Sequence, residues 1–226
     1  MQDQAKQFFK EGVAFNLLGR YTEALASLDK VLAIDPDNAE VWFTRGVTLG
    51  RLGQLAESVV SFDKAVAIDP DFANAWNIRG LVLINLKRYA EAIASFDKAI
   101  AIKPDYPNMW NSRGLALESL GRHTEAVASF DKAIAIKPDY AVAWNMRGIA
   151  LDRLGKYTEA IESFDKAIAI KPDYAVAWNM RGITLDRLGR HTEAIASVDK
   201  AISIDPENDE AQKVRKIAFQ RQNRKS

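Results

Sequence analysis

The rarest residues of this 226-residue chain recur at one fixed interval. Each tryptophan lies 34 residues after the previous one, and most glycines and prolines keep the same interval. The residues that define this period include Trp42, Trp76, Trp110, Trp144, Trp178, Gly12, Gly46, Gly80, Gly114, Gly148, Gly182, Pro36, Pro70, Pro104, Pro138, Pro172 and Pro206. A period of this length is typical of stacked supersecondary units that bury their apolar faces against one another. The sequence therefore predicts a repeat protein that forms one stack.

One period of this chain has the pattern of two short helices. In residues 141–174 the first half carries apolar residues at helical spacing and closes at Gly155, whereas the second half starts near Thr158 and stops at Pro172. Threonine before a helix and glycine just after one are cap signals. Gly148 lies inside the first helix, where glycine costs about 1 kcal/mol relative to alanine. We expect that the backbone of the second helix approaches there, so that a Cβ would be blocked.

Six such units and a closing helix account for most of the chain. The first unit has Phe8 in the tryptophan position, and the closing helix has Gln212 and Lys216 in the tryptophan and glycine positions. A polar end unit is what a stack of repeats requires for solubility. The predicted units are 5–38, 39–72, 73–106, 107–140, 141–174 and 175–208, followed by a capping helix and basic tail over 209–226.

The tryptophan, glycine, alanine, phenylalanine and proline positions together resemble the tetratricopeptide repeat family, in a bacterial-type form. The resemblance covers about nine-tenths of the chain. It departs from the family pattern at the residue before the first glycine, which is arginine in five units, as at Arg45 and Arg147. The resemblance implies an all-α, right-handed superhelix, an α-solenoid whose first helices line a concave surface where extended peptides lie. It also implies a protein-interaction scaffold.

Composition and motifs argue against several other functions. The net charge is +1, which is unlike a protein that coats nucleic acid or an anionic membrane. There is no cysteine and no phosphate-binding, HExxH or G-x-S-x-G motif, so we predict no catalytic residue, no metal and no cofactor. No 18-residue apolar run or signal pattern is visible, and we expect a cytoplasmic protein that binds no membrane. The basic residues near the end suggest a solvated cap and no nucleic-acid contact; they are Lys213, Arg215, Lys216, Arg221, Arg224 and Lys225.

Two sets of polar residues repeat with the scaffold, which favours structural roles. His123 and His191 take the position of Tyr21, Tyr89 and Tyr157 in other units, so we expect them to pack and not to ligate or catalyse. An arginine in the first helix recurs with an aspartate in the second helix. This recurrence predicts an arginine–aspartate ladder between helices, formed by Arg45, Arg79, Arg113, Arg147 and Arg181 with Asp63, Asp97, Asp131, Asp165 and Asp199.

A row of asparagines on the first helices is the main candidate binding site. An amide can both donate to and accept from a peptide backbone, and an aliphatic row lies beside these amides on the same helical face. The candidate peptide-binding residues are Asn77, Asn111, Asn145, Asn179, Leu81, Leu115, Ile149, Ile183, Phe9, Phe43, Met146, Met180, Arg153 and Arg187.

These residues predict capture of an extended peptide segment by a monomer or weak homo-oligomer. Three alternatives stay open. The asparagines could bond neighbouring helices or turns and keep the register of the stack. The near-identical repeats could form a structural self-assembly module, or the chain could be the targeting arm of a larger enzyme. Concentration-dependent mass distinguishes self-assembly from a monomer with an open groove.

Overall fold

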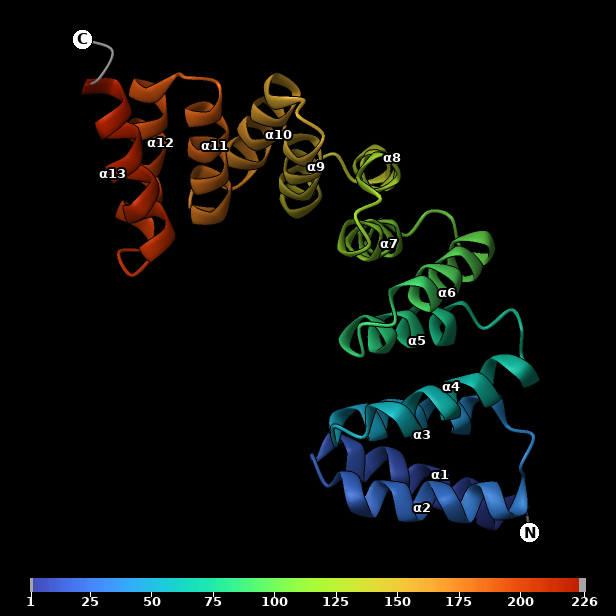
Figure 1. Ribbon diagram of the computed structural model, residues 1–226. Helices are drawn as coiled ribbons and strands as arrows, with labels where there is room; N and C mark the ends of the chain where they lie inside the picture. Colours follow the sequence, from blue (N-terminus) through green and yellow to red (C-terminus); the bar gives the residue numbers. More distant parts are fainter. Residues whose placement is uncertain (1, 224–226) are drawn as a thin grey trace. The chain divides into compact units, whose positions relative to one another are not determined.

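The computed structural model describes residues 2–223, and this part of the chain consists of thirteen α-helices without any strand (Figure 1). The fold is an all-α helical repeat, as the period predicts. Arg224 and Lys225 of the expected basic tail lie outside the described residues. The helices are α1 (Gln2–Leu17), α2 (Tyr21–Ile34), α3 (Ala39–Arg51), α4 (Leu55–Ile68), α5 (Ala73–Asn85), α6 (Tyr89–Ile102), α7 (Pro107–Ser119), α8 (His123–Ile136), α9 (Ala141–Arg153), α10 (Tyr157–Ile170), α11 (Ala175–Arg187), α12 (His191–Ile204) and α13 (Asp209–Asn223).

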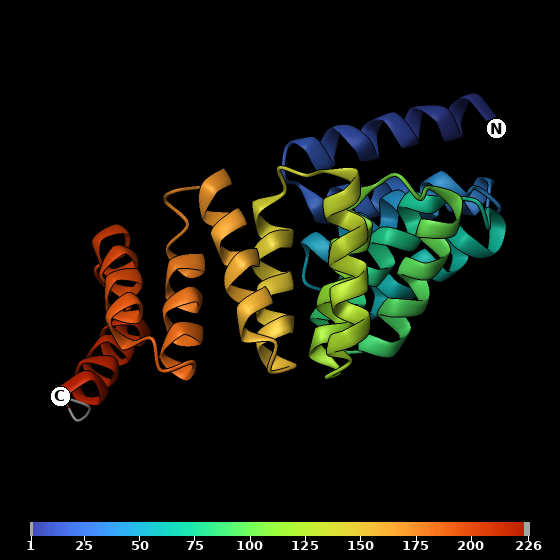
Figure 2. The same cartoon turned by 90° about the horizontal axis from the view of Figure 1, so that it is seen from above.

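The chain divides into two compact units, 1–116 and 117–226, and the boundary between them lies inside α7. Within each unit consecutive helices pack side by side and run back and forth (Figure 2). The first helices of successive repeats also touch, as α1 touches α3 and α9 touches α11. This local packing is what a helix–turn–helix period dictates, because each helix covers the apolar stripe of its neighbours.

The glycine inside the first helix makes room for a side chain of the second helix in five repeats, at Gly12, Gly46, Gly80, Gly148 and Gly182. A Cβ added to Gly80 would lie 2.7 Å from the Phe96 ring, and one added to Gly148 would lie 2.5 Å from the Phe164 ring. Both phenylalanines are fully buried. The expectation that the second-helix backbone makes the approach is therefore wrong at these positions. The atoms closest to the added Cβ belong to the phenylalanine ring, and not to the backbone of the second helix.

The turn between the paired helices depends on a left-handed residue. Gly19, Gly53, Gly121, Gly155 and Gly189 all have φ between 72° and 78°. Lys87 takes this position in the third repeat with φ 59°. Since residues with a Cβ are strained in this region, the glycines at the other turns are the favoured choice. The lysine shows that the surrounding fold imposes the turn even against this strain.

The predicted arginine–aspartate ladder is confirmed, and it has an additional partner. The Arg79 Nε donates to Asp63 Oδ1 in the preceding second helix at 2.6 Å. Its Nη1 donates to Ser95 Oγ in the paired second helix, also at 2.6 Å. Arg45, Arg147 and Arg181 repeat both contacts with Asp29, Asp131 and Asp165 and with Ser61, Ser163 and Ser197. Each arginine thus joins two successive second helices.

The tryptophans fix the turn between repeats through a hydrogen bond. In each case the indole Nε1 donates to the carbonyl oxygen of the proline six residues earlier, at 2.8–2.9 Å. In α13 the Gln212 Nε2 donates to the Pro206 carbonyl at 2.8 Å. The glutamine therefore preserves the turn while it removes the large apolar ring, which suits the end of a stack.

Candidate peptide-binding face

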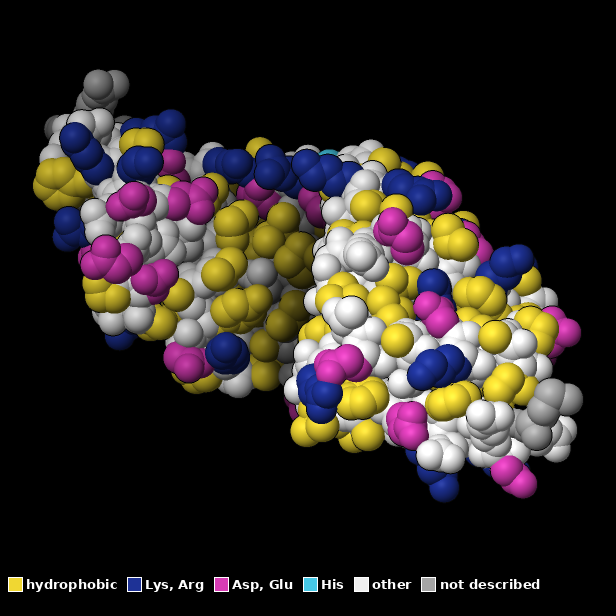
Figure 3. All heavy atoms as spheres, turned by 90° about the horizontal axis from the view of Figure 1, so that it is seen from below, with side chains coloured by type: hydrophobic (Ala, Val, Ile, Leu, Met, Phe, Trp, Pro, Cys, Tyr) yellow, Lys and Arg dark blue, Asp and Glu magenta, His cyan; other side chains and the backbone are white. Residues whose placement is uncertain are grey.

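The candidate site in residues 117–226 is one face of α9 and α11. Val142 and Val176 stand out from this face and are 41% and 48% exposed. Figure 3 shows one face of the molecule, on which hydrophobic side chains form exposed patches among the charged ones. The expected Ile149, Ile183, Met146 and Met180 are half-buried on the same two helices. Met180 and Ile149 pack against one core cluster, which links the faces of α9 and α11.

In residues 1–116 the corresponding face is more aromatic. Phe9 of α1 and Phe43 of α3 are half-buried. The Phe43 ring lies 4.9 Å from that of Phe72 and 5.8 Å from that of Phe62, measured between ring centroids. Leu81 of α5 is exposed, and Leu115 of α7 is half-buried. The aliphatic row predicted from the sequence is thus accessible in part in both units.

The predicted asparagine row is mostly covered. Asn77 is half-buried, whereas Asn111, Asn145 and Asn179 are 6%, 1% and 3% exposed. The Oδ1 atoms of these three residues are buried and accept no hydrogen bond. The Asn179 Nδ2 donates to Glu210 Oε2 of α13 at 3.1 Å. An unpartnered buried acceptor costs about 1–3 kcal/mol. A row of such acceptors is unusual in a folded protein.

The two candidate arginines have different environments. Arg153 is exposed at the end of α9. Arg187 of α11 forms an ion pair with the buried Asp152 of α9, which also accepts from Thr184 Oγ1 at 2.9 Å. Arg187 therefore joins two first helices, a contact that the sequence period did not indicate. A comparable contact joins Arg221 of α13 to Asp186 of α11.

The two histidines are bonded to carboxylates. The His123 Nδ1 lies 2.7 Å from Glu118 Oε2, and the His191 Nδ1 lies 2.9 Å from Asp186 Oδ1. His191 is buried and His123 is half-buried, as expected for packing residues. Sequence reasoning missed their acidic partners, although the five-residue spacing in both repeats is a usable signal. No cluster of three potential ligands for a metal ion occurs among residues 2–223.

An aromatic row in the turns between repeats was also missed. Phe72, Tyr106, Tyr140 and Tyr174 recur at the same period, directly before a first helix. The Lys137 and Lys171 ammonium groups lie over the Tyr140 and Tyr174 rings at 5.4 and 5.2 Å. Burial raises the pKa of Tyr140 and of Tyr174, and the neighbouring Tyr140 raises the pKa of Tyr174 further. Both tyrosines are therefore neutral hydrogen-bonding groups at ordinary pH.

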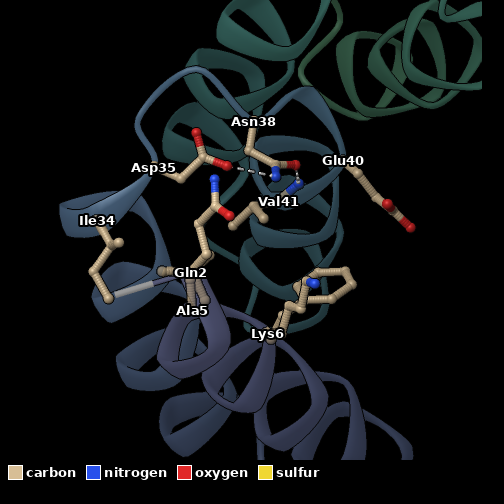
Figure 4. Close-up of a pocket in the computed structure, with 10 residues that line it drawn as sticks. Gln2, Ala5, Lys6, Ile34, Asp35, Asn38, Glu40 and Val41 are labelled. Atoms are coloured by element: carbon tan, nitrogen blue, oxygen red, sulfur yellow. Dashed lines mark hydrogen bonds between the residues drawn. The ribbon is translucent and has the colours of Figure 1, made fainter.

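The first of these turn positions carries Asn38, and a cavity of about 440 Å³ lies beside it (Figure 4). Its apolar walls come from α1, α2 and α3, and polar side chains lie at its rim. The lining residues are Gln2, Ala5, Lys6, Phe9, Val31, Ile34, Asp35, Asn38, Glu40 and Val41. Phe9 is the one predicted site residue among them. None of the helices that the structure describes combines the length and apolar character needed to cross a bilayer.

A comparison with protein families identifies the repeat. A tetratricopeptide repeat model matches residues 43–107 and 145–209, which together make up more than half of the chain. The chain belongs to the tetratricopeptide repeat family. Further models of this repeat match residues 12–53 and 105–173. Family membership supports a role as a protein–protein interaction scaffold. No curated protein matches this sequence.

Solved structures of tetratricopeptide repeat proteins have the same fold. YrrB, described as a TPR protein with an unusual peptide-binding site, is 23% identical with a TM-score of 0.73; the match covers 84% of this chain and 97% of YrrB. A MamA protein is 28% identical with a TM-score of 0.73, and the match covers 77% of this chain and 96% of that one. MamA from Desulfovibrio magneticus RS-1 is 23% identical with a TM-score of 0.72, over 76% and 97% of the two chains.

Proposed function

We propose that this tetratricopeptide repeat protein holds an extended peptide segment against its first helices. The aliphatic row Leu81, Leu115, Ile149 and Ile183 would take apolar side chains of the segment, with Met146 and Met180 beside it. The amides of Asn77, Asn111, Asn145 and Asn179 would bond its backbone. Phe9, Phe43, Arg153 and Arg187 would contact the segment at the borders of this face.

The observation that carries this proposal is the set of buried Oδ1 atoms without donors on Asn111, Asn145 and Asn179. Backbone N–H groups of an extended segment are the donors that such acceptors lack. Because these side chains are covered, binding must be coupled to their movement. The terminal torsion of asparagine is broad, so rotation of the amide is inexpensive. A further cost is the displacement of neighbouring side chains.

The magnitude of the expected interaction is moderate. A neutral hydrogen bond contributes about 0.5–1.5 kcal/mol net, so loss of two amide contacts should weaken binding by about fivefold to 150-fold. The apolar contact adds to this. Val142 and Val176 already lie in solvent, and their burial by a ligand is favourable because it removes apolar surface from water.

A peptide-display selection tests the proposal. The purified protein is compared with an Asn145→Ala/Asn179→Ala variant and with a Val142→Glu/Val176→Glu variant. We expect the wild-type protein to enrich a class of extended peptides that both variants bind at least about fivefold more weakly. The asparagine variant should remain folded, since the loss of two unpartnered buried acceptors offsets part of the cost of losing the Asn179–Glu210 hydrogen bond.

Glu162→Ala, an exposed change on the second helix α10, serves as the matched control and should bind as the wild type does. If every variant enriches the same peptides as the wild-type protein, the asparagines have only a structural role. Destabilisation of the asparagine variant together with unchanged binding would lead to the same conclusion.

A second candidate function is self-assembly, which exposed apolar residues near both ends of the described chain favour. Leu17, the last residue of α1, and Leu18 after it are 85% and 69% exposed, and Phe219 of α13 is 56% exposed. Solvent-exposed residues of this kind gain by contact with another copy. Sedimentation over a hundredfold concentration range would reveal such association, and Leu17→Glu should abolish it. A constant monomer mass would exclude it.

A further inference from the structure

We infer that one exposed side of α13 binds an amphipathic helix of another protein, and that this helix carries carboxylates. Arg215, Lys216 and Phe219 define this side, which we call the open side of α13. They lie three and four positions apart, so they share one side of the helix. The inference does not depend on the proposed function, because the residues of the candidate peptide-binding face are on other helices.

The contacts of α13 are those of a first helix. Its Arg215 Nε donates to Asp199 of α12, as the ladder arginines do to the preceding second helix. Its Ala211 packs on Val198 and Ala201 of the same helix. No second helix follows α13 among residues 2–223. The helix therefore contacts the preceding repeat and lacks a paired second helix in this part of the chain.

The position of Phe219 belongs to the core in every other repeat that has leucine there. The equivalent leucines are at most 2% exposed; they are Leu49, Leu83, Leu117, Leu151 and Leu185. Leu151 packs on Ala160 and Phe164 of its paired second helix. Phe219 is 56% exposed. A polar residue would suit the solvated end of a stack, whereas a phenylalanine ring gains much by burial against a partner.

Arg215 also lacks one of the partners that the ladder arginines have. The side chains of Arg79 and Arg181 are 15% and 19% exposed, and each Nη1 donates to a serine of the paired second helix at 2.6 Å. The Arg215 side chain is 56% exposed. It keeps the aspartate bond, but the residues that the structure describes include no paired second helix to supply the serine. Its guanidinium can thus donate to an acceptor on an added helix.

Lys216 determines which kind of helix can bind. It takes the position of Gly148 and Gly182, where an added Cβ would lie 2.5 Å from Phe164 and from Val198 of the paired second helix. An apolar side chain seated in that way is therefore excluded at Lys216. A carboxylate can instead reach the ammonium from farther away and form a charge-assisted hydrogen bond.

The charges of α13 favour a different protein over a second copy as the source of this helix. Residues 212–223 contain four basic residues and no acidic one; the basic residues are Lys213, Arg215, Lys216 and Arg221. Another α13 would thus bring cations and no carboxylate to the open side. An amphipathic helix with acidic residues beside its apolar stripe complements both the ring and the cations.

The probes are two labelled peptides with the sequence of the second helix α12, residues 191–204. One is unchanged and the other carries Val198→Glu, at the position that faces Gly182 of the paired first helix. Fluorescence anisotropy measures their binding to the full chain. We expect the Val198→Glu peptide to bind about fivefold more tightly than the unchanged one, the ratio for one partly exposed ion pair. Added salt should remove this difference.

Three variants test which residues are responsible. Lys216→Glu should make the Val198→Glu peptide bind more weakly than the unchanged one, because the two carboxylates repel. Phe219→Ser should weaken both peptides at least about fivefold, since the apolar contact is lost. Ile217→Ser is the matched control, because Ile217 is 45% exposed on the opposite side of α13, and it should bind both peptides as the wild-type protein does.

Equal binding of the two peptides to the wild-type protein would overturn the inference, as would no binding of either; both results are independent of how the variants fold. Sedimentation provides a further check. An oligomer that Phe219→Ser dissociates and Ile217→Ser does not would show that a second copy covers the open side, which also overturns the inference. The proposed function fails separately, because a protein that binds the acidic helix and enriches no extended peptide has the α13 site alone.

Discussion

Gly46 and Gly50 lie one helical turn apart in α3, yet their surroundings differ. A Cβ on Gly46 would lie 2.8 Å from the buried Phe62 ring, whereas one on Gly50 would meet only Ser58 Oγ at 3.5 Å. Glycine in a helix interior costs about 0.5–1 kcal/mol relative to alanine. At Gly46 this cost is offset because the absence of a Cβ lets the Phe62 ring pack against the helix. No such contact offsets the cost at Gly50.

This contrast gives a prediction at the scale of single residues. Gly46→Ala should lower the free energy of unfolding by about 1–3 kcal/mol, because the methyl group overpacks a rigid ring. Gly50→Ala in the same helix should raise the free energy of unfolding by about 0.5–1 kcal/mol. Urea denaturation followed by circular dichroism measures both. Equal effects of the two substitutions would show that ring contact does not explain the recurrent glycine.

At the scale of helices, two kinds of arginine contact coexist in this chain. Arg79 is largely covered and joins α4 to α6 through Asp63 and Ser95. Arg88 is exposed and bonds Glu91, three residues later at the start of α6. The hydrogen bond from Arg88 lowers the pKa of Glu91. Solvent screening makes exposed pairs of this kind weak.

We therefore expect Arg79 of the ladder to contribute much more to the free energy of unfolding than Arg88 of the local pair. Arg79→Ala should reduce the free energy of unfolding by about 1–3 kcal/mol, the range for hydrogen bonds to charged groups with partial burial. Arg88→Ala, which removes the same type of side chain, should cause no measurable change. Thermal and urea denaturation of both variants checks this. If both variants lost the same free energy of unfolding, the bridge from Arg79 to two second helices would stabilise the protein no more than the exposed Arg88–Glu91 pair does.

At the scale of the molecule, stability is local because each helix packs on close neighbours in the sequence. Within residues 117–223, α13 packs on α11 and α12. Ala211 of α13 is fully buried and packs with Val198 and Ala201 of α12. In a stack with such neighbour contacts, damage at one end should remain at that end.

Hydrogen exchange tests this locality. Ala211→Asp buries an unpaired charge and should detach α13, so that its amides exchange rapidly while those of α9 and α10 keep their protection. Lys213→Asp introduces the same residue at an exposed position of α13 and should leave the exchange pattern unchanged. Faster exchange throughout α9–α13 would show a cooperative unit larger than neighbouring repeats.

The period by itself determined the helical repeat, the approximate helix ends and the arginine–aspartate ladder. These features follow from local spacing, since the same residues recur in the same helical positions. The second helix of the fifth repeat was expected to start near Thr158, and it begins at Tyr157. The expected threonine cap is wrong, because Thr158 lies inside the helix and the N-cap residue, Lys156, makes no side-chain cap hydrogen bond. The turn glycines also follow from sequence, because their left-handed backbone is a local property.

Only the tertiary structure decided which of these recurring side chains are open to a ligand. The helical spacing placed Asn145 on the same face as Ile149, but its burial depends on atoms from neighbouring helices. The partner of Arg187 lies 35 residues away in α9, and the partner of Gly148 is a ring in α10. The cavity beside Asn38 is bounded by side chains from three different helices, α1, α2 and α3. A sequence period fixes which residues are equivalent, whereas burial and open space depend on how unlike side chains pack together in three dimensions.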